Sequence, residues 1–402
     1  MTTTSPTTTA SPTTTGTPRT GTAKDAVVGV VPGEVVCPND AAELVEVLRT
    51  AAAGGRTVLA AGGRSKLGWA PAPRSADLLV DTTGLDRVVE HTAGDLVVVA
   101  EAGVRLSTLQ EQLASAGQWL ALDPPEPGAT LGGILSANAA GPRRLRYGTV
   151  RDLLIGVTVV LADGTVAHSG GKVVKNVAGY DLGKLYTGAH GTLGVVASTT
   201  WRLHPVPAAR RVVVLDLSDP LAAGPLALAL ARSTLTPTAV ELRATTGGPA
   251  SLTVAFEAIA ESVKAQADAA VTLLGGGRQD ADLPEHFGER PGTTEDLVLR
   301  LAFAPASLTA VLAALPPGTE VTAEACSGIA HVALPDAGAL PALRTALLPH
   351  DGSAVVLSAP AQLRPALEHW GPLGDAVALM QRVKDRFDPD RRLAPGRFVG
   401  GI

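Results

Sequence analysis

Two glycine-rich segments in the first half of the chain constrain its fold more than any other feature of the sequence. Residues 60–68 read AAGGRSKLG and directly follow a short apolar run, and residues 124–141 read PPEPGATLGGILSANAAG. Where side chains are missing, backbone N–H groups can approach a phosphate or a ring closely, and Ser65 adds a hydroxyl donor. Taken alone, the first segment is equally consistent with a surface turn. Two such segments in one domain predict a site for one extended ligand.

The spacing within these segments argues against two common nucleotide sites. A Walker A loop has Ser or Thr after its lysine, whereas Lys66 is followed by Leu67. Neither segment contains the GxGxxG of a Rossmann fold. P-loop and simple NAD-binding folds therefore lose support.

The composition fits a protein with a large core and no nucleic-acid partner. Of the 402 residues, 46% are apolar and only 18% are charged, against an average of about 25% charged. The net charge of −5 offers no general attraction to nucleic acid or anionic lipid. The two cysteines, Cys37 and Cys326, lie far apart in the sequence and form no CxxC. This excludes a disulfide framework and a cysteine-ligated zinc or iron–sulfur site.

The location expected from the sequence is the cytoplasm. No apolar run reaches the roughly 18 residues that indicate a membrane span, and the N-terminus lacks the charged and apolar regions of a signal peptide. Residues 1–23 are mostly Thr, Ser and Pro, a composition with little to bury. We expect these residues to form a disordered tail.

Local patterns in the first half predict a mixture of helices and strands. Asn39 and Asp40 are good caps for an apolar-periodic stretch, so we expect a helix that ends before Gly54. A strand at 57–60 and further short strands should follow. The segment Ser107 to Gln110 has the pattern of a capping box and predicts the start of another helix.

The later patterns predict a hairpin, a boundary and a second sheet. Asp163-Gly164 separates two strand-like runs and is suited to a type I′ turn. Pro205-Val206-Pro207 marks a boundary between a glycine-rich half and a half rich in Ala and Leu. Beyond it, strands alternate with helices, which indicates an α+β layer with helices on one face of a sheet. The expected elements are strands near 212–217, 239–243, 252–257 and 296–303, and helices near 221–231, after 258 and at 307–315.

Six segments together resemble a known family. Besides the two glycine-rich segments, residues 175–185 read KNVAGYDLGKL and residues 188–196 read GAHGTLGVV. The C-terminal part carries MQRVKDRFDP at 380–389 and LAPGR at 393–397. These segments resemble the vanillyl-alcohol-oxidase-like (PCMH-type) FAD-linked oxidases and, within them, the FAD-binding subunits of glycolate oxidase. The resemblance covers about residues 27–207 and the last two dozen residues.

The resemblance implies an α+β fold with four parts. The tail at 1–23 would precede a PCMH-type FAD-binding domain of two α+β subdomains at 24–207. A smaller α+β cap domain with an antiparallel sheet would follow at 208–375. The C-terminal segment, 376–402, would return to the FAD-binding domain.

The cofactor implied by the resemblance is FAD, held between the two subdomains. The pyrophosphate is expected on Gly62, Gly63, Arg64, Ser65 and Gly68; the flavin side on Gly128, Ala129, Thr130, Gly132, Gly133, Asn138 and Gly141; and the adenine–ribose end on Gly191, Gly194, Val195 and Val196. Gly179 and Tyr180 are further candidates, with a turn and a core tyrosine as the alternative. Relatives that attach FAD covalently carry His at the position of Arg64, so we expect non-covalent FAD.

Two departures from the family pattern concern catalysis. Ala394 stands where the closing motif usually has Asn, which removes a polar side chain. Catalytic relatives carry a segment resembling HAGDGNLH, whereas residues 324–331 read EACSGIAH and keep only the final histidine. A two-histidine metal site is therefore not expected, and we predict no metal.

His331 and Arg300 are the candidate catalytic residues. His331 has the side chain for a base toward a hydroxyl proton, and its alternative role is a hydrogen-bonded histidine on a half-buried strand. Arg300 alternates with apolar neighbours and could direct its guanidinium at a carboxylate; the alternative is a solvated strand face. The basic cluster Arg143, Arg144 and Arg146 favours cofactor phosphate or structural carboxylates over nucleic acid.

The function expected first is that of an FAD-binding subunit of a glycolate oxidase-like 2-hydroxyacid dehydrogenase. The resemblance implies a larger FAD-linked paralogue and an iron–sulfur subunit as partners, and through them an association with the inner face of the membrane. A non-catalytic FAD-binding or electron-relay subunit is a second hypothesis. A stand-alone FAD-dependent sugar or aldonolactone oxidase is a third.

Overall fold

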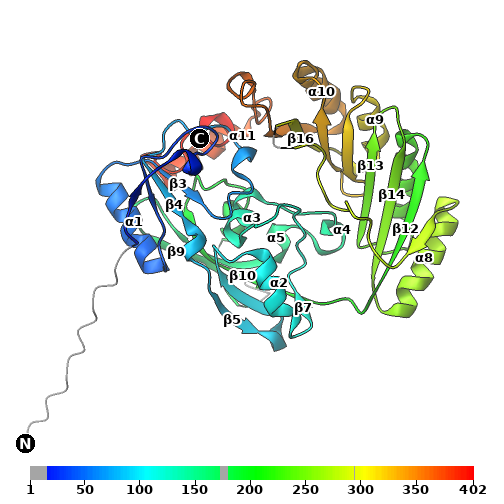
Figure 1. The fold of residues 1–402 in the computed structure, drawn as a ribbon, viewed down its shortest axis with the longest axis horizontal. Helices are drawn as coiled ribbons and strands as arrows, with labels where there is room; N and C mark the ends of the chain where they lie inside the picture. The colour runs from blue at the N-terminus through cyan, green and yellow to red at the C-terminus, as the bar shows by residue number, and fades with distance from the viewer. Residues whose placement is uncertain (1–15, 173–179, 294) are drawn as a thin grey trace, which may run out of the picture.

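Two small sheets formed within residues 19–202 lie beside one large sheet formed within residues 209–358 (Figure 1). The computed structural model describes residues 16–172, 180–293 and 295–402. Helices and strands are mixed in both halves, so the predicted α+β fold class is confirmed. Among the described residues, every helix is too short or too polar to cross a membrane.

The first small sheet has the strand order β1-β2-β4-β3. Its strands are β1 (Arg19–Thr20), β2 (Glu34–Val36), β3 (Val58–Ala61) and β4 (Leu78–Asp81). Strand β4 is parallel to β2 and β3, and helix α1 (Ala41–Ala53) lies between β2 and β3 in the chain. The prediction for α1 is confirmed: the Asp40 side chain accepts a hydrogen bond from the Glu43 N–H at 2.9 Å, and the helix ends before Gly54.

The second small sheet is antiparallel, with the order β5-β6-β10-β8-β9. Its strands are β5 (Val88–Thr92), β6 (Val97–Glu101), β8 (Leu154–Val160), β9 (Val166–Gly170) and β10 (Val195–Arg202). Around it lie α2 (Leu106–Ala114), α3 (Leu131–Ala137), α4 (Arg144–Tyr147), α5 (Val150–Leu153), α6 (Gly183–Tyr186) and the strand pair β7 (Gln118–Trp119) and β11 (His204–Pro205). Side chains of α1, β8 and β10 share one buried cluster, so the two sheets pack as one domain.

The hairpin between β8 and β9 forms as predicted, but its turn is not type I′. That turn needs positive φ at both central residues, and only Gly164 has it, at 83°. The Gly164 N–H donates to the Leu161 carbonyl at 2.9 Å, and the Leu161 N–H donates to the Thr165 carbonyl at 2.8 Å. The connection is therefore a three-residue loop that ends on a left-handed glycine.

The capping box predicted at Ser107 is also wrong. Helix α2 begins one residue earlier, at Leu106, and Arg105 caps it without a side-chain hydrogen bond. Arg105 forms a β-bridge with Thr130, and the Leu106 N–H donates to the Ala129 carbonyl at 2.9 Å. A long-range backbone contact therefore sets the start of this helix.

The large sheet has eight antiparallel strands in the order β15-β12-β14-β13-β17-β18-β16-β19. In chain order they are β12 (Ala209–Leu217), β13 (Ala239–Thr245), β14 (Ala250–Ala258), β15 (Arg278–Asp280), β16 (Leu297–Ala302), β17 (Glu320–Glu324), β18 (Ile329–Leu334) and β19 (Ser353–Ser358). Its helices are α7 (Ala223–Arg232), α8 (Ala260–Leu274), α9 (Leu308–Ala313) and α10 (Leu340–Leu347).

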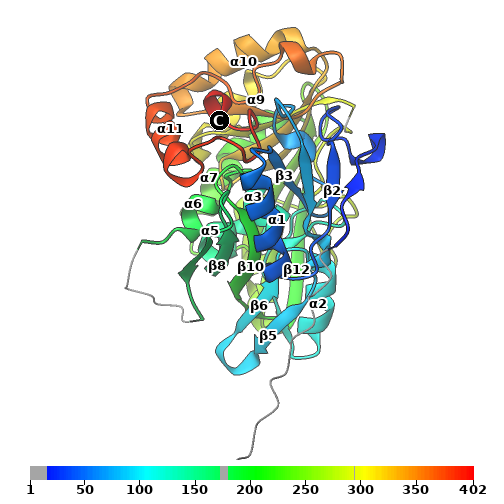
Figure 2. The same ribbon diagram turned by 90° about the vertical axis from the view of Figure 1, so that its left-hand side faces the viewer.

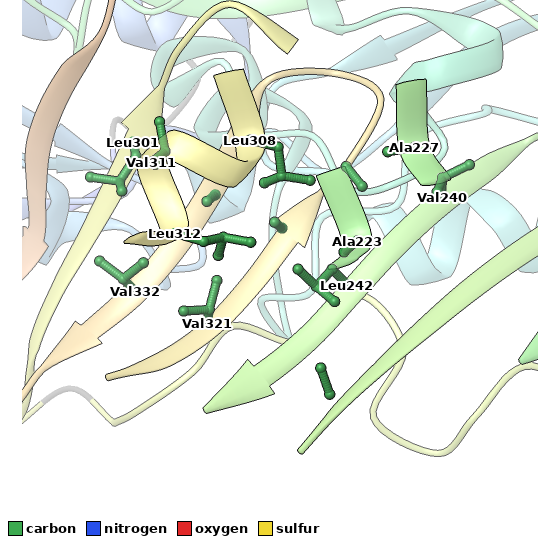
Figure 3. Close-up of a cluster of buried hydrophobic side chains, with 14 of the residues drawn as sticks. Ala223, Ala227, Val240, Leu242, Leu301, Leu308, Val311, Leu312, Val321 and Val332 are labelled. Carbon is green, nitrogen blue, oxygen red and sulfur yellow. The ribbon is translucent and has the colours of Figure 1, made fainter. Parts of the chain in front are cut away.

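These helices pack on one face of the large sheet. Leu242, Val321 and Val332 from the strands contact Ala223 and Leu312 from the helices in a buried apolar cluster (Figure 3). Successive side chains of a strand point to opposite faces. The other face of the sheet is therefore free to carry the polar side chains that alternate with this core.

The C-terminal part of the chain returns to the first domain, as Figures 1 and 2 show by the red segment beside the blue and green elements. Helix α11 (Ala376–Phe387) places the Phe387 ring 5.9 Å from the ring of Tyr186. Val58 donates its N–H to the Arg392 carbonyl and accepts from the Ala394 N–H, both at 2.9 Å. The chain after α11 therefore lies against β3.

The expectation of a disordered tail is wrong for residues 16–23. Within this stretch, β1 pairs with β2, and Arg19 forms an ion pair with the buried Asp25 at 2.7 Å. Burial of that carboxylate needs a partner, and Arg19 supplies it. Residues 1–15 lie outside the described residues.

Candidate functional site

A cavity lies between the two small sheets, where both glycine-rich segments meet. The predicted residues that line it are Gly62, Gly63, Arg64, Ser65, Thr130, Gly132, Gly133, Gly191, Gly194, Val195 and Val196. They come from the loop after β3, from the start of α3 and from the chain entering β10. Segments that are far apart in the sequence thus form one wall.

Gly62 and Gly63 allow the two glycine-rich segments to touch. A Cβ atom on Gly63 would lie 1.9 Å from the Gly128 carbonyl oxygen, and one on Gly62 would lie 2.3 Å from Thr130 Oγ1. The room left by these two glycines is filled by the neighbouring segment and not by a ligand. Their role is to build the cavity wall.

Gly133 and Gly191 instead present open backbone. A Cβ atom on Gly191 would meet nothing within 4 Å, and one on Gly133 would meet only Thr130 Oγ1, at 3.2 Å. Gly191 has a φ of 75°, which disfavours other residues. Backbone at these two positions is therefore accessible to a molecule in the cavity.

The other predicted binding residues lie away from this lining. The Ala129 carbonyl accepts from α2, and Gly128 lies behind Gly63. Asn138 ends α3 at a φ of 49°, and its Oδ1 is buried with no hydrogen-bond partner among the described residues. Gly141 packs on Asp123, a Cβ atom on Gly68 would lie 3.6 Å from the Leu357 carbonyl oxygen of β19, and Tyr180 is 92% exposed. Gly179 lies outside the described residues.

Arg64 contributes its backbone to the cavity and points its side chain elsewhere. Its guanidinium donates to the Lys24 carbonyl at 3.2 Å and lies 3.4 Å from carboxylate oxygens of both Asp25 and Asp81. It therefore ties the first glycine-rich segment to the N-terminal part of the domain.

The wall also contains residues that the sequence did not predict, among them Arg397 and His190. Arg397 is 5% exposed and donates to the Leu67 and Pro71 carbonyls at 2.7 and 2.9 Å. No carboxylate of the described residues pairs with it, and burial lowers its pKa to about 10. A buried cation without a counter-charge suits an anionic group in the cavity. Its place in the LAPGR motif was the available clue.

His190 lies where the cavity meets the second half of the chain. Its ring is 5.1 Å from Trp370 and 6.0 Å from Phe398, between ring centroids. Burial, with smaller contributions from Arg397 and Arg300, lowers its pKa to about 3.

The polar face of the large sheet is linked to the cavity wall, because Arg290 bonds both to His331 on that face and to Glu126. Glu126 in turn lies 3.3 Å from Nζ of Lys66, which lines the cavity.

On that face, three guanidiniums surround His331. Arg300 and His331 are directly opposite each other on β16 and β18, so their side chains share one face of the sheet. Arg144 and Arg290 reach the same place from outside the sheet. Burial and these three charges hold the pKa of His331 well below its ordinary value. His331 is therefore a neutral imidazole in a positively charged pocket.

Two of the three guanidiniums have carboxylate partners and one has none. Arg144 Nε lies 2.8 Å from Glu324 Oε2, and Arg290 Nε lies 2.6 Å from Glu126 Oε1. Arg300 has no such partner among the described residues, and its buried Nε lacks a hydrogen bond. Burial, Arg144 and Arg290 all lower the pKa of Arg300. This unpaired guanidinium is suited to a ligand carboxylate.

The basic cluster Arg143, Arg144 and Arg146 mainly meets structural carboxylates. Arg143 binds Glu257 with two hydrogen bonds, at 2.8 and 3.0 Å, and Arg144 pairs with Glu324. Burial raises the pKa of Glu324 to about 7. No group of three or more metal-ligating side chains occurs in the part of the chain that the structure describes.

Comparisons with known proteins agree with this geometry. The family model described as an FAD binding domain matches residues 32–170. The chain is 41% identical over 124 residues to glycolate oxidase subunit GlcE of Escherichia coli, which covers 30% of this chain and 35% of the relative. It is 32% identical over 213 residues to mitochondrial D-lactate dehydrogenase [cytochrome] of Arabidopsis thaliana, which covers 53% of this chain and 37% of the relative. Only about a third of each relative's length is thus matched.

A solved structure extends the likeness in fold to nearly the whole chain. An alkyldihydroxyacetonephosphate synthase superposes with a TM-score of 0.68, covering 91% of this chain and 76% of that one, at 16% identity. Its similarity concerns the fold alone. The cavity between two small sheets, its open glycine backbone, its buried Arg397 and the matched family model all fit FAD. This chain therefore carries a PCMH-type FAD-binding domain, and its cofactor is FAD.

Proposed function

We propose that this chain is the FAD-binding subunit of a 2-hydroxyacid dehydrogenase of the glycolate oxidase type. The observation that carries the proposal is Arg300, a guanidinium without a carboxylate partner among the described residues, beside His331. His331 is linked to the FAD cavity through Arg290 and Glu126. A substrate carboxylate would supply the missing charge. The curated relatives named for glycolate and D-lactate are named for substrates of this class.

Arg300 and His331 would then act on different groups of the substrate. Arg300 binds the carboxylate, and Nε2 of the neutral His331 receives the hydroxyl proton. The low pKa of His331 arises partly from Arg300, so a carboxylate that neutralises Arg300 makes His331 a better base. FAD, when bound, accepts the hydride from the α-carbon.

The electrons would leave through partner proteins. This sequence has only two cysteines and so supplies no iron–sulfur cluster of its own. We infer an iron–sulfur subunit and a larger FAD-linked paralogue as partners, which would also bring the chain to the inner face of the membrane from the cytoplasm. The names of two relatives, glycolate oxidase subunits GlcE and GlcD, support an assembly of several subunits.

A single anaerobic experiment tests the catalytic proposal. The purified full chain, loaded with FAD, is mixed with glycolate or D-lactate, and the visible flavin absorbance is followed. Bleaching is the expected result. Bound flavin that stays oxidised with both acids would overturn catalysis on this chain. In a separate aerobic assay, oxygen consumption with sugars or aldonolactones above background would instead favour a stand-alone oxidase.

A second candidate function is that of a non-catalytic electron-relay subunit, and two observations favour it. Ala394 places a methyl group in the cavity wall where relatives carry a polar Asn, and Glu324 replaces the first histidine of the family segment. Co-purification with a bleachable paralogue, while the chain alone stays unreactive, would support this role.

We also propose that the FAD is held without a covalent bond. Arg64 occupies the position at which covalent relatives have His, and its guanidinium is engaged by Asp25 and Asp81. Acid denaturation and filtration of the loaded protein should release all of the flavin. Yellow colour that stays with the precipitated protein would contradict the proposal.

A further inference from the structure

Arg290 reaches from the large-sheet domain to the second glycine-rich segment and to Trp69, which directly follows the first. It lies between β15 and β16, directly after residues 286–289, which are held by hydrogen bonds to β13. Arg243 donates to the His286 and Glu289 carbonyls at 2.8 and 3.0 Å, and the Gly288 N–H donates to Glu241 Oε2 at 2.7 Å. A side chain on so restrained a loop is held in position for a contact across the interface.

The contacts of Arg290 join three parts of the site. Its Nε donates to Glu126 at 2.6 Å, and its guanidinium lies over the Trp69 ring, 4.5 Å from the centroid. Its Nη1 donates to Nε2 of His331. Because an arginine has no acceptor, this hydrogen bond occupies the lone pair of His331 Nε2. The atom that should receive a substrate proton is therefore blocked in this arrangement.

The charge balance around Glu126 shows what could release this contact. Glu126 is the partner of Arg290 and also lies 3.3 Å from Lys66 Nζ. One carboxylate thus serves two buried cations, and Arg300 nearby has none. Arg290, Lys66 and Arg300 together carry more positive charge than Glu126 neutralises, so a further carboxylate would be stabilised there. Such a carboxylate would bind the guanidinium groups of Arg300 and Arg290, and Glu126 already pairs with that of Arg290.

We propose that Arg290 is a second substrate-binding residue and that the Glu126 carboxylate competes with the substrate carboxylate for its guanidinium. The carboxylate of the substrate takes the place of Glu126 on the Arg290 guanidinium and draws it away from His331. Nε2 of His331 is then free to accept the hydroxyl proton. This inference rests on the proposed function, because it assumes that a small carboxylate enters the pocket beside FAD.

The test compares oxalate binding by the FAD-loaded full chain and its variants. Oxalate is a small carboxylate without a C–H bond to oxidise, so binding can be measured without turnover. Perturbation of the flavin absorbance band and isothermal titration calorimetry are the two readouts. Arg290→Gln should weaken oxalate binding about tenfold or more, whereas Glu126→Gln should strengthen it at least about threefold.

The opposite changes in oxalate affinity expected for the two variants distinguish substrate recognition from a purely structural role of the pair. If the Arg290–Glu126 pair only held the domains together, both variants would weaken binding, and that result would overturn the inference. Arg290→Lys keeps the charge and loses the planar fork, and should give an intermediate affinity. Arg210→Gln is the control, since Arg210 on β12 pairs at 2.9 Å with Glu257 on the neighbouring strand β14. It should leave the oxalate affinity unchanged.

The outcomes also separate this inference from the proposed function. If the loaded wild-type chain binds no oxalate, both fail. If it binds oxalate and Arg290→Gln binds it equally well, only the role of Arg290 fails. Thermal unfolding of each variant confirms that a lost signal does not come from a misfolded protein.

Discussion

Lys384 and Asp388 form an ion pair inside the FAD-binding domain, with Nζ 2.7 Å from Oδ2 and less than 2% of either side chain exposed. Lys384 also donates to the Thr192 carbonyl at 2.7 Å and to the Leu393 carbonyl at 2.8 Å. Thr192 follows Gly191 in the cavity wall, and Leu393 lies next to Ala394. The pair therefore links the C-terminal segment to the cofactor site.

Lys384→Met should lower the free energy of unfolding by about 3–5 kcal/mol, because it leaves a buried carboxylate without its counter-charge. It should also weaken FAD binding. Urea unfolding of the apoprotein and fluorescence titration with FAD measure the two effects. Lys264→Met, in an exposed pair on α8, is the control and should cost less than about 1 kcal/mol. Equal costs for the two variants would contradict a structural role for the buried pair.

Gly63→Val should abolish FAD uptake and lower the melting temperature. The added side chain would meet the Gly128 carbonyl, 1.9 Å from the Cβ position, so the two glycine-rich segments must separate. Gly94→Ala is the control, because a Cβ atom there would meet nothing within 4 Å. Flavin retention after desalting gives the answer. Normal uptake by Gly63→Val would show that the contact between the segments is dispensable.

Glu241 should make the apoprotein less stable as the pH rises. Burial raises its pKa from 4.5 to about 8, so the folded state holds a proton that the unfolded state has already lost. The stabilisation is complete below pH 4.5 and disappears as the pH rises through 8, at a rate approaching about 1.4 kcal/mol per pH unit between them. Urea unfolding from pH 5 to 8 should show this slope.

Glu241→Gln should reduce that slope, because the amide does not titrate, whereas Glu324 keeps its own contribution up to about pH 7. The exposed Glu320 on β17 offers the control, since Glu320→Gln removes a carboxylate without touching the buried one. A wild-type slope retained in Glu241→Gln would assign the pH dependence to another group.

Arg300→Leu should change stability and ligand binding in opposite directions. The variant removes an unpaired guanidinium that burial, Arg144 and Arg290 all disfavour, so the apoprotein should gain about 1 kcal/mol. Oxalate binding should weaken at least about tenfold. Arg144→Leu is the contrasting variant and should destabilise the protein, because Arg144 neutralises the buried Glu324. A loss of stability in Arg300→Leu would show that its guanidinium is already satisfied.

Features set by neighbouring residues could be predicted from the sequence. The cap of α1 by Asp40 depends on a residue three positions away. The lack of side chains in the glycine-rich segments is likewise visible in the sequence itself. Helix α2 was misplaced because its start depends on pairing between Arg105 and Thr130, which no local pattern records. Packing between distant segments overrides local preference in such places.

The pocket around His331 could be predicted only in part, for the same reason. Arg300 and His331 were visible as polar residues within apolar strands. The contact of Arg290 with Glu126 spans 164 positions and depends on how the two domains face each other. The proposal that catalysis involves His331 stays a prediction, whereas the partner that occupies its Nε2 could come only from the structure.

The backbone contacts of Val58 with Arg392 and Ala394 have a consequence for how the protein is made. A ribosome releases β3 and the first glycine-rich segment long before Ala394 and Arg397, which line the same cavity. In between, the whole large-sheet domain is synthesised and can fold. The wall of the cavity therefore stays incomplete while the large-sheet domain is being made. The FAD site can thus be completed only after Arg397 has left the ribosome.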